Sequence, residues 1–264
     1  MIEAILAGLF GLIIGSFLNV CVFRMPRDIS VANPKRSFCP HCDTEIAWYD
    51  NIPVVSYAVL GGRCRSCRAG IPLRYPLVEL FTGLAFFGVL VWLGPTLEAV
   101  KYCAFAAIQI ALIAMDLEER ILADEFTKGG IALGLIFAAF VPMPMGLLQL
   151  VLPQEWPVAL KSVAESAFAA SLLSGILWSI GWFYEKIRRR EGLGFGDVKM
   201  VGMIGAFLGL GPALLTVVMG SVMGSVVGLL FIFLTRKDAH TYELPFGSFL
   251  GLAAMLVAVW VRSV

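Results

Sequence analysis

Two aspartates stand at the borders of long apolar runs, where a charged side chain is least expected. Asp116 closes one run, and Asp197 follows the glycine-rich stretch 192–196 and directly precedes another. An ionisable group at the edge of a membrane segment is expensive to keep there and is by default a functional candidate. Taken alone, Asp197 can equally be an N-terminal helix charge that the helix dipole favours. A second carboxylate at the same depth favours chemistry.

The chemistry that two such carboxylates offer is hydrolysis of an amide. Water is a poor nucleophile and an amine is a poor leaving group, and two carboxyl groups that share one proton address both problems. The ionised group takes a proton from water, while the protonated group polarises the carbonyl and later assists the amine. Adjacent like charges cannot easily both ionise, so the pair titrates as a unit. Neither Asp116 nor Asp197 is therefore assigned a fixed acid or base role.

Four cysteines form a second group of chemically competent residues, in the motifs Cys39-Pro-His-Cys42 and Cys64-Arg-Ser-Cys67. Twenty-one residues separate the two pairs, just beyond the usual zinc-ribbon gap of about 15–20. Four thiolates at this spacing predict one tetrahedral structural Zn²⁺. Disulfides are the weaker alternative because the loop is expected to face the reducing cytosol, and a redox-active pair is the other. The loop histidine between the first two cysteines is a possible replacement ligand.

The composition shows what kind of element must position these residues. Of the 264 residues 59% are hydrophobic and only 15% charged, and the mean hydropathy is +0.86. Soluble domains are about 45–50% apolar and about 25% charged, so this is a polytopic membrane protein in contact with the lipid bilayer. The net charge of +1 does not indicate a nucleic acid partner. Residues 1–23 contain no Lys or Arg, so the first apolar run is expected to stay as a transmembrane helix.

A helix that crosses about 30 Å of hydrocarbon needs about 20 apolar residues. The sequence therefore predicts an all-α polytopic membrane protein with about eight transmembrane helices and a small cytoplasmic zinc-knuckle loop domain. We expect a first helix within 1–23, the four-cysteine loop domain at 24–73 and a seven-helix domain at 74–264. The eight runs are 3–23, 74–93, 99–115, 129–148, 163–184, 198–211, 213–235 and 246–262.

Basic residues orient this topology. With the N-terminus outside, 17 of the 20 Lys and Arg residues lie on the inner side, as the positive-inside rule requires. The third helix then runs inward and ends near Asp116, and the sixth runs outward and starts near Asp197. Both carboxylates are expected at the same depth on the cytoplasmic side.

The two aspartates and their contexts resemble the type IV prepilin peptidases, membrane aspartic proteases of the Gly-x-Gly-Asp class that also includes presenilin and the archaeal preflagellin peptidases. In that family one catalytic Asp opens Asp-x6-Pro-Asp and the other closes Gly-x-Gly-Asp, which match Asp116 and Asp197. The chain departs from the pattern at Ala123, where the family usually has Pro before the residue equivalent to Asp124. Four further features match in the same order along the chain: Gly15–Val20 with Arg24–Pro26, the double cysteine loop, Tyr75–Leu80 and Glu243–Gly247.

The resemblance implies a function. Its substrates are type IV prepilins and type II secretion pseudopilins, which carry a short basic leader that is cut at the cytoplasmic face of the bacterial inner membrane. The family is often bifunctional and methylates the new N-terminus with S-adenosylmethionine. No Gly-x-Gly-x-x-Gly pattern for that cofactor is present, so its site is not placed and the activity rests on resemblance alone.

Two other readings of the polar residues stay open. Intramembrane carboxylates also serve ion- or proton-coupled transporters, or lie in non-catalytic scaffolds. A zinc-linked redox sensor uses the cysteines and leaves the aspartates unexplained. Asn19 and Glu79 are polar residues in apolar helices, where they must find partners, either as packing contacts or as the lining of a site.

Overall fold

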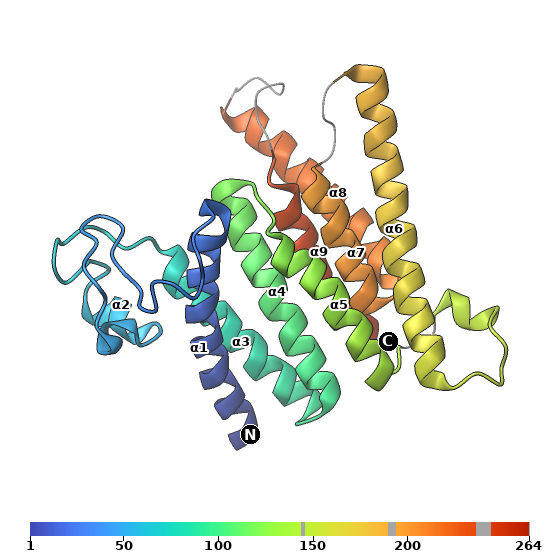
Figure 1. Cartoon of the computed structure of the whole chain (residues 1–264), viewed down its shortest axis with the longest axis horizontal. Helices are drawn as coiled ribbons and strands as arrows, with labels where there is room; N and C mark the ends of the chain where they lie inside the picture. Colours follow the sequence, from blue (N-terminus) through green and yellow to red (C-terminus); the bar gives the residue numbers. More distant parts are fainter. Residues whose placement is uncertain (144–145, 190–193, 236–243, 264) are drawn as a thin grey trace. The chain divides into compact units, whose positions relative to one another are not determined.

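The computed structural model describes residues 1–143, 146–189, 194–235 and 244–263. The prediction of an all-α chain is confirmed for these residues, because each of the eight apolar runs contains a helix and only isolated β-bridges occur. The long helices are α1 (Ile2–Arg24), α3 (Arg74–Leu93), α4 (Leu97–Glu119), α5 (Asp124–Phe140), α6 (Val158–Arg188), α7 (Phe195–Leu208), α8 (Leu210–Thr235) and α9 (Phe246–Ser263) (Figure 1). A short helix, α2 (Val55–Val59), lies in the polar loop.

Five segments of the described chain are long and apolar enough to cross a membrane, so the protein is a multi-pass membrane protein. They are Ile2–Arg27, Arg74–Leu93, Leu97–Glu119, Val158–Arg188 and Leu210–Phe231. The remaining long helices, α5, α7 and α9, have 17, 14 and 18 residues. The count of eight spans therefore stays a prediction.

Some helices begin or end at other residues than the apolar runs of the sequence, because charged residues and a proline influence the helix ends. The run 129–148 begins earlier as a helix, at Asp124, because acidic residues in a first turn favour the helix dipole. The same helix ends at Phe140, since Pro142 restricts the residue before it to extended conformations. Helix α4 continues past Asp116 to Glu119, and α7 begins two residues before Asp197. Both aspartates consequently lie inside terminal helical turns.

The chain divides into two compact units, Met1–Met115 and Asp116–Val264. In the first unit α1 packs closely along α3 (Figure 1). A Cβ added at Gly15 would lie 2.6 Å from the Cα of Glu79, which is closer than real Cβ atoms approach. The Asn19 amide donates a 2.9 Å hydrogen bond to the Tyr75 carbonyl across the same interface. Asn19 thus acts in helix packing, one of the two roles that its sequence context left open.

The polar loop of the first unit is held by buried charged groups at its two ends. The Arg24 guanidinium, at the end of α1, donates to four loop carbonyls, those of Ser30, Val31, Pro34 and Arg36. Near the start of α3, Glu79 Oε2 accepts a 2.7 Å hydrogen bond from the Val54 backbone N–H. Glu79 therefore supports the fold of the loop.

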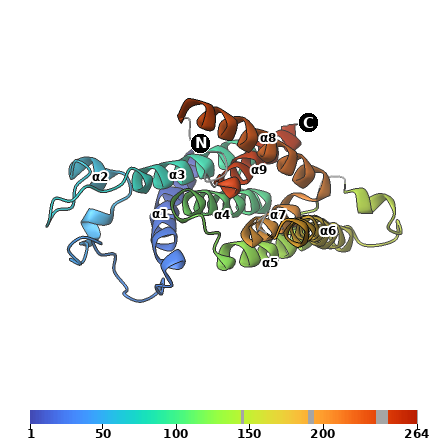
Figure 2. The same ribbon diagram turned by 90° about the horizontal axis from the view of Figure 1, so that it is seen from above.

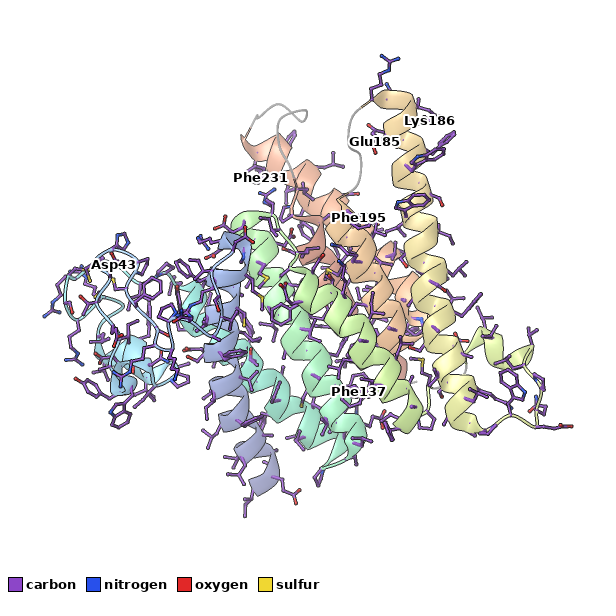
Figure 3. All side chains as sticks on the ribbon, in the orientation of Figure 1. Asp43, Phe137, Glu185, Lys186, Phe195 and Phe231 are labelled. Carbon is purple, nitrogen blue, oxygen red and sulfur yellow. The ribbon has the colours of Figure 1, made fainter. Side chains whose placement is uncertain are left out.

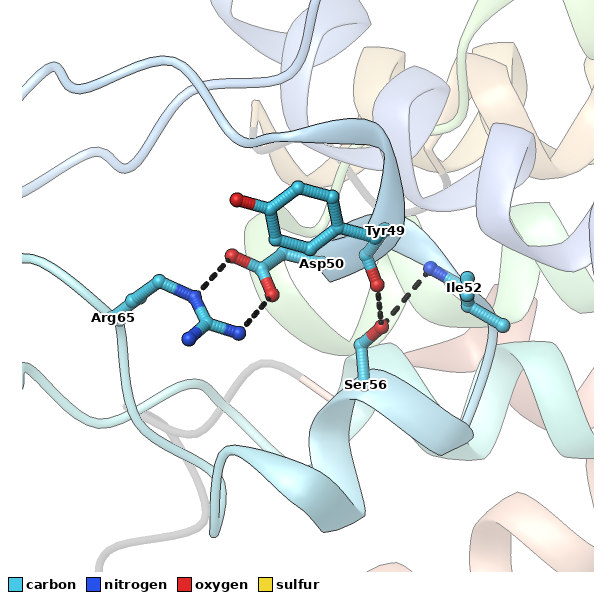
Figure 4. Close-up of polar contacts among 5 residues, drawn as sticks. All are labelled: Tyr49, Asp50, Ile52, Ser56 and Arg65. Atoms are coloured by element: carbon cyan, nitrogen blue, oxygen red, sulfur yellow. Dashed lines mark hydrogen bonds and ion pairs between the residues drawn. The ribbon is translucent and has the colours of Figure 1, made fainter.

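A 3-10 helix of the loop, η2 (Trp48–Asn51), is joined to the second cysteine motif by an ion pair (Figure 4). The Arg65 guanidinium donates to both carboxylate oxygens of Asp50, at 2.7 and 2.6 Å, and this contact holds the pKa of Asp50 below its usual value. The Ser56 hydroxyl donates to the Tyr49 carbonyl at 2.8 Å and accepts from the Ile52 N–H at 3.1 Å. These contacts fix the position of the residue that follows Cys64.

In the second unit α7 packs against both α5 and α6, which also contact each other (Figure 2). A Cβ at Gly134 of α5 would lie 2.9 Å from the Ala206 carbonyl carbon, and one at Gly205 would lie 3.0 Å from the Ala169 carbonyl of α6. The Ser166 hydroxyl donates to the Ala206 carbonyl at 2.7 Å. Close backbone packing thus fixes α7 on two sides, which places the helix that begins with Asp197. Helix α9 packs mainly on α8.

Candidate active site and metal centre

Asp116 is buried in the last turn of α4, where its carboxylate meets the start of α9. Both the backbone N–H and the hydroxyl of Ser248 donate to Asp116 Oδ2, at 2.6 and 2.7 Å. Ser248 lies in the first turn of α9, where backbone N–H groups lack partners within the helix and attract negative charge. The start of α9 therefore stabilises one ionised carboxylate at the end of α4.

Asp197 lies in the first turn of α7 and is partly buried. The structure brings it close enough to Asp116 for the two carboxylate charges to repel each other, although the two residues are 81 apart in the sequence. The glycine-rich stretch before Asp197 is described only in part, since Gly192 and Leu193 lie outside the described residues.

Leu122, in the turn between α4 and α5, lies against the two glycines that directly precede Asp197 and Ser248. A Cβ at Gly196 would lie 3.1 Å from Leu122 Cβ, and a Cβ at Gly247 would lie 3.1 Å from Leu122 Cδ1 and 3.2 Å from Asp116 Cγ. The two glycines therefore let α7 and α9 approach this leucine closely.

An ion-pair cluster joins the starts of α5 and α7 close to this site. The Asp124 carboxylate forms ion pairs with two lysines. One is Lys199, two residues after Asp197, and the other is Lys128, whose Nζ lies 2.6 Å from Asp124 Oδ2. Hydrogen bonds from these two lysines, with the larger effect from Lys128, hold the pKa of Asp124 below its usual value. The Lys199 ammonium lies 5.1 Å from the ring centre of Phe195, which Figure 3 labels at the start of α7. Asp124 therefore has a structural role, as an ion-pair partner close to the two candidate aspartates.

The arrangement can perform acid–base hydrolysis. It offers two neighbouring carboxyl groups, one of them held by two donors. The sequence motifs alone did not indicate a site role for Ser248, Leu122 or Lys199. The one available signal for Ser248 was its place directly after Glu243–Gly247, of which Glu243 lies outside the described residues.

The four motif cysteines of the first unit lie together. The Sγ atoms of Cys39, Cys42, Cys64 and Cys67 are all within 4.8 Å of one another. Cys21 and Cys103, the other cysteines of the chain, are buried as expected of small core residues.

The two cysteine motifs share one backbone design. In each, the N–H of the first cysteine bonds the carbonyl five residues later, Cys39 to Thr44 and Cys64 to Ala69. In each, the residue after the second cysteine has a positive φ, 52° at Asp43 and 61° at Arg68; Figure 3 labels Asp43. Each motif is thus a tight knuckle that turns both of its thiols to the same side.

This donor set fits zinc. With Zn–S bonds of about 2.3 Å, tetrahedral geometry places sulfur atoms about 3.8 Å apart, and Cys39 Sγ lies 3.8 Å from Cys67 Sγ. The Thr44 side chain, with its hydroxyl 3.4 Å from Cys42 Sγ, lowers the pKa of Cys42 to about 6. A thiol with a lowered pKa is a ready metal ligand, since the thiolate is the form that binds. The cluster can therefore hold a metal such as zinc.

Two family models match the chain. The model described as "Bacterial Peptidase A24 N-terminal domain" matches residues 9–93, which include both cysteine motifs. The model described as "Type IV leader peptidase family" matches residues 103–229, which include both aspartates. Together they cover most of the chain.

Curated relatives agree with these models. The chain is 35% identical over 257 residues, 97% of its length, to the prepilin leader peptidase/N-methyltransferase of Myxococcus xanthus, of which it covers 71%. Proteins of the same name from Pseudomonas aeruginosa and Aeromonas hydrophila are each 32% identical, with 88% and 90% of their lengths covered. No solved structure matches the chain significantly.

Proposed function

The chain belongs to the type IV leader peptidase family, and we propose from this that it is a prepilin peptidase with a second, N-methyltransferase activity. As a membrane aspartic endopeptidase it removes the short basic leader from type IV prepilins and type II secretion pseudopilins. We place the reaction at the cytoplasmic face of the bacterial inner membrane. The bias of 17 of 20 basic residues to that side supports this orientation.

The observation that carries the proposal is the meeting of Asp116 and Asp197 at the ends of α4 and α7. In the proposed reaction the pair holds one proton. The ionised carboxylate takes a proton from water, whose oxygen attacks the scissile carbonyl, and the protonated carboxyl donates to the carbonyl oxygen. The leaving amine then receives a proton as the C–N bond breaks.

The surroundings of the pair suit a peptide bond next to a membrane helix. The site lies at helix ends, so a substrate can extend its leader into water while its apolar segment stays among helices. This geometry supports cleavage at the boundary between a polar leader and an apolar helix.

Two ligands belong to the proposal. We propose that Cys39, Cys42, Cys64 and Cys67 hold one structural Zn²⁺, which ties the two knuckles of the loop together. S-adenosylmethionine would supply the methyl group that is transferred to the amine released by cleavage. This second activity rests on the names of the relatives, and none of the described residues is assigned to it.

Co-expression with a prepilin, followed by mass spectrometry of its N-terminus, tests the function. Wild type should release the leader, whereas Asp116→Asn and Asp197→Asn should each lower the cleavage rate by about 100-fold or more, as expected for loss of an acid–base group. Asp28→Asn is the matched control, because Asp28 is exposed in the loop and has a left-handed backbone that Asn tolerates.

Cleavage at the wild-type rate by either dyad variant, in folded protein, would refute the assignment. The ion- or proton-coupled transporter would then be the remaining role for the buried carboxylates. A pilin that is cut but carries an unmodified N-terminus would refute the methyltransferase activity alone.

A further inference from the structure

The two candidate aspartates have unequal environments. Asp116 Oδ2 receives two hydrogen bonds from Ser248, one from the backbone N–H and one from the hydroxyl, and both residues are buried. Within the part of the chain that the structure describes, no hydrogen bond reaches the Asp197 carboxylate. The interaction that does reach it is repulsion from the charge of Asp116.

The position of Ser248 explains how it supplies two donors to one atom. It is the third residue of α9, in a turn whose N–H groups have no carbonyl partner within the helix. Its N–H also lies 3.2 Å from the Pro245 carbonyl, so the turn before the helix is tight. The neighbouring Gly247 has no Cβ to fill the space taken by the Asp116 carboxylate. The carboxylate therefore docks on a helix N-terminus that is reinforced by a hydroxyl.

Donors favour the ionised form of a carboxyl group, and a nearby like charge disfavours it. We propose that Ser248 is a positioning residue that keeps Asp116 as the ionised member of the pair, so that the shared proton rests on Asp197. The inference depends on the proposed peptidase function. It assigns distinct roles to two residues that their sequence contexts treat alike.

The other charged groups near Asp116 do not remove this asymmetry. Arg120, one turn later at the end of α4, acts on Asp116 with an opposite charge and so also favours its ionised form. Asp197 faces it from α7. Asp124, at the start of α5, is paired with two lysines. On α9, the groups that contact the Asp116 carboxylate are the uncharged backbone N–H and hydroxyl of Ser248.

The assignment gives each proton a path. Asp116 takes a proton from water as the water oxygen bonds to the carbonyl carbon, and Asp197 gives its proton to the carbonyl oxygen. The tetrahedral intermediate then collapses: the leaving nitrogen takes the proton from Asp116, the C–N bond breaks, and the hydroxyl proton returns to Asp197. Both carboxyl groups end the cycle as they began it.

Variants that remove the donors in steps test the proposal through the pH dependence of cleavage. Ser248→Thr keeps both donors, Ser248→Ala removes the hydroxyl, and Ser248→Pro removes both, with proline tolerated in a first helical turn. The acidic limb of the rate profile reports protonation of the base. The pH midpoint of this acidic limb should be unchanged in Ser248→Thr and about one pH unit higher in Ser248→Ala, as expected for loss of one hydrogen bond to a charged group. It should be higher still in Ser248→Pro.

Ser171→Ala is the matched control, because Ser171 is exposed on α6 and bonds carbonyls of its own helix. KM should change little in all Ser248 variants, since Ser248 acts through Asp116. If Ser248→Pro does not fold, the difference between the acidic limbs of Ser248→Ala and Ser248→Thr tests the proposal by itself.

An unchanged acidic limb in Ser248→Ala, or an equal shift in Ser248→Thr, would overturn the inference while the peptidase function stands. A wild-type protein that does not cut a prepilin, or an Asp116→Asn variant that does, would overturn the proposed function and this inference with it.

Discussion

Replacement of Gly205 by Ala tests whether backbone packing in the second unit holds the helix that carries Asp197. A Cβ at Gly205 would lie 3.0 Å from the carbonyl carbon and oxygen of Ala169 and 3.1 Å from the nitrogen of Ala170, all of them main-chain atoms of α6. Ordinary contact begins at 3.4 Å, so α7 must move away by about 0.4 Å. Helix α5 restricts that movement, because Gly134 meets α7 closely at the next residue, Ala206.

The expected effect follows from two opposing terms. Ala is favoured over Gly inside a helix by about 1 kcal/mol, and overpacking costs about 1–3 kcal/mol. The net change is a loss of about 0–2 kcal/mol, or a fall in Tm of up to about 8 °C for a chain of this size. Gly175→Ala on α6 is the matched control, because a Cβ there meets nothing within 4 Å. That variant keeps only the helix-propensity gain, and its Tm should rise by about 2–4 °C.

Thermal unfolding in detergent measures both variants, and the rate of leader removal is read in parallel. Gly205→Ala should cleave more slowly than Gly175→Ala, since a shift of α7 displaces Asp197 from Asp116. A Tm that rises equally in the two variants would refute the close approach of α6 and α7.

Three further predictions follow from the charged and thiol groups. Metal analysis should find about one Zn per chain. Exchange of Cys39 and Cys42 for Ser should abolish zinc binding, and acidification should release the zinc because thiols must lose protons to bind. Asp124→Asn should lower Tm at pH 7. The difference in Tm from wild type should shrink as the pH falls below the usual aspartate pKa of 3.8 and vanish only below the lowered pKa of the folded state, since a carboxyl with a lowered pKa stabilises the fold only while ionised. Reversal of Glu118 and Glu119 to Lys should raise KM for a basic-leader substrate more than for a leader without Lys or Arg, in a kinetic assay where the gap narrows as salt rises.

Much of the molecule could be predicted from local pattern. Apolar runs of helical length identified every long helix, because a segment of that length in lipid must satisfy its backbone internally. The spacing of the four cysteines predicted that their thiols would converge, since each pair closes a tight knuckle within six residues. The two aspartates were selected because they end and begin apolar runs, and the direction of successive helices then requires a common depth.

Only the tertiary structure decided which residues complete the site. Ser248 meets Asp116 across 132 residues, and Lys199 meets Asp124 across 75. Hydropathy and motif spacing describe how far a residue lies along a helix, but they do not say which face of one helix meets which face of another. That choice depends on small residues such as Gly205 and Gly247, where backbones approach closely enough to bring a donor within hydrogen-bond distance of a carboxylate.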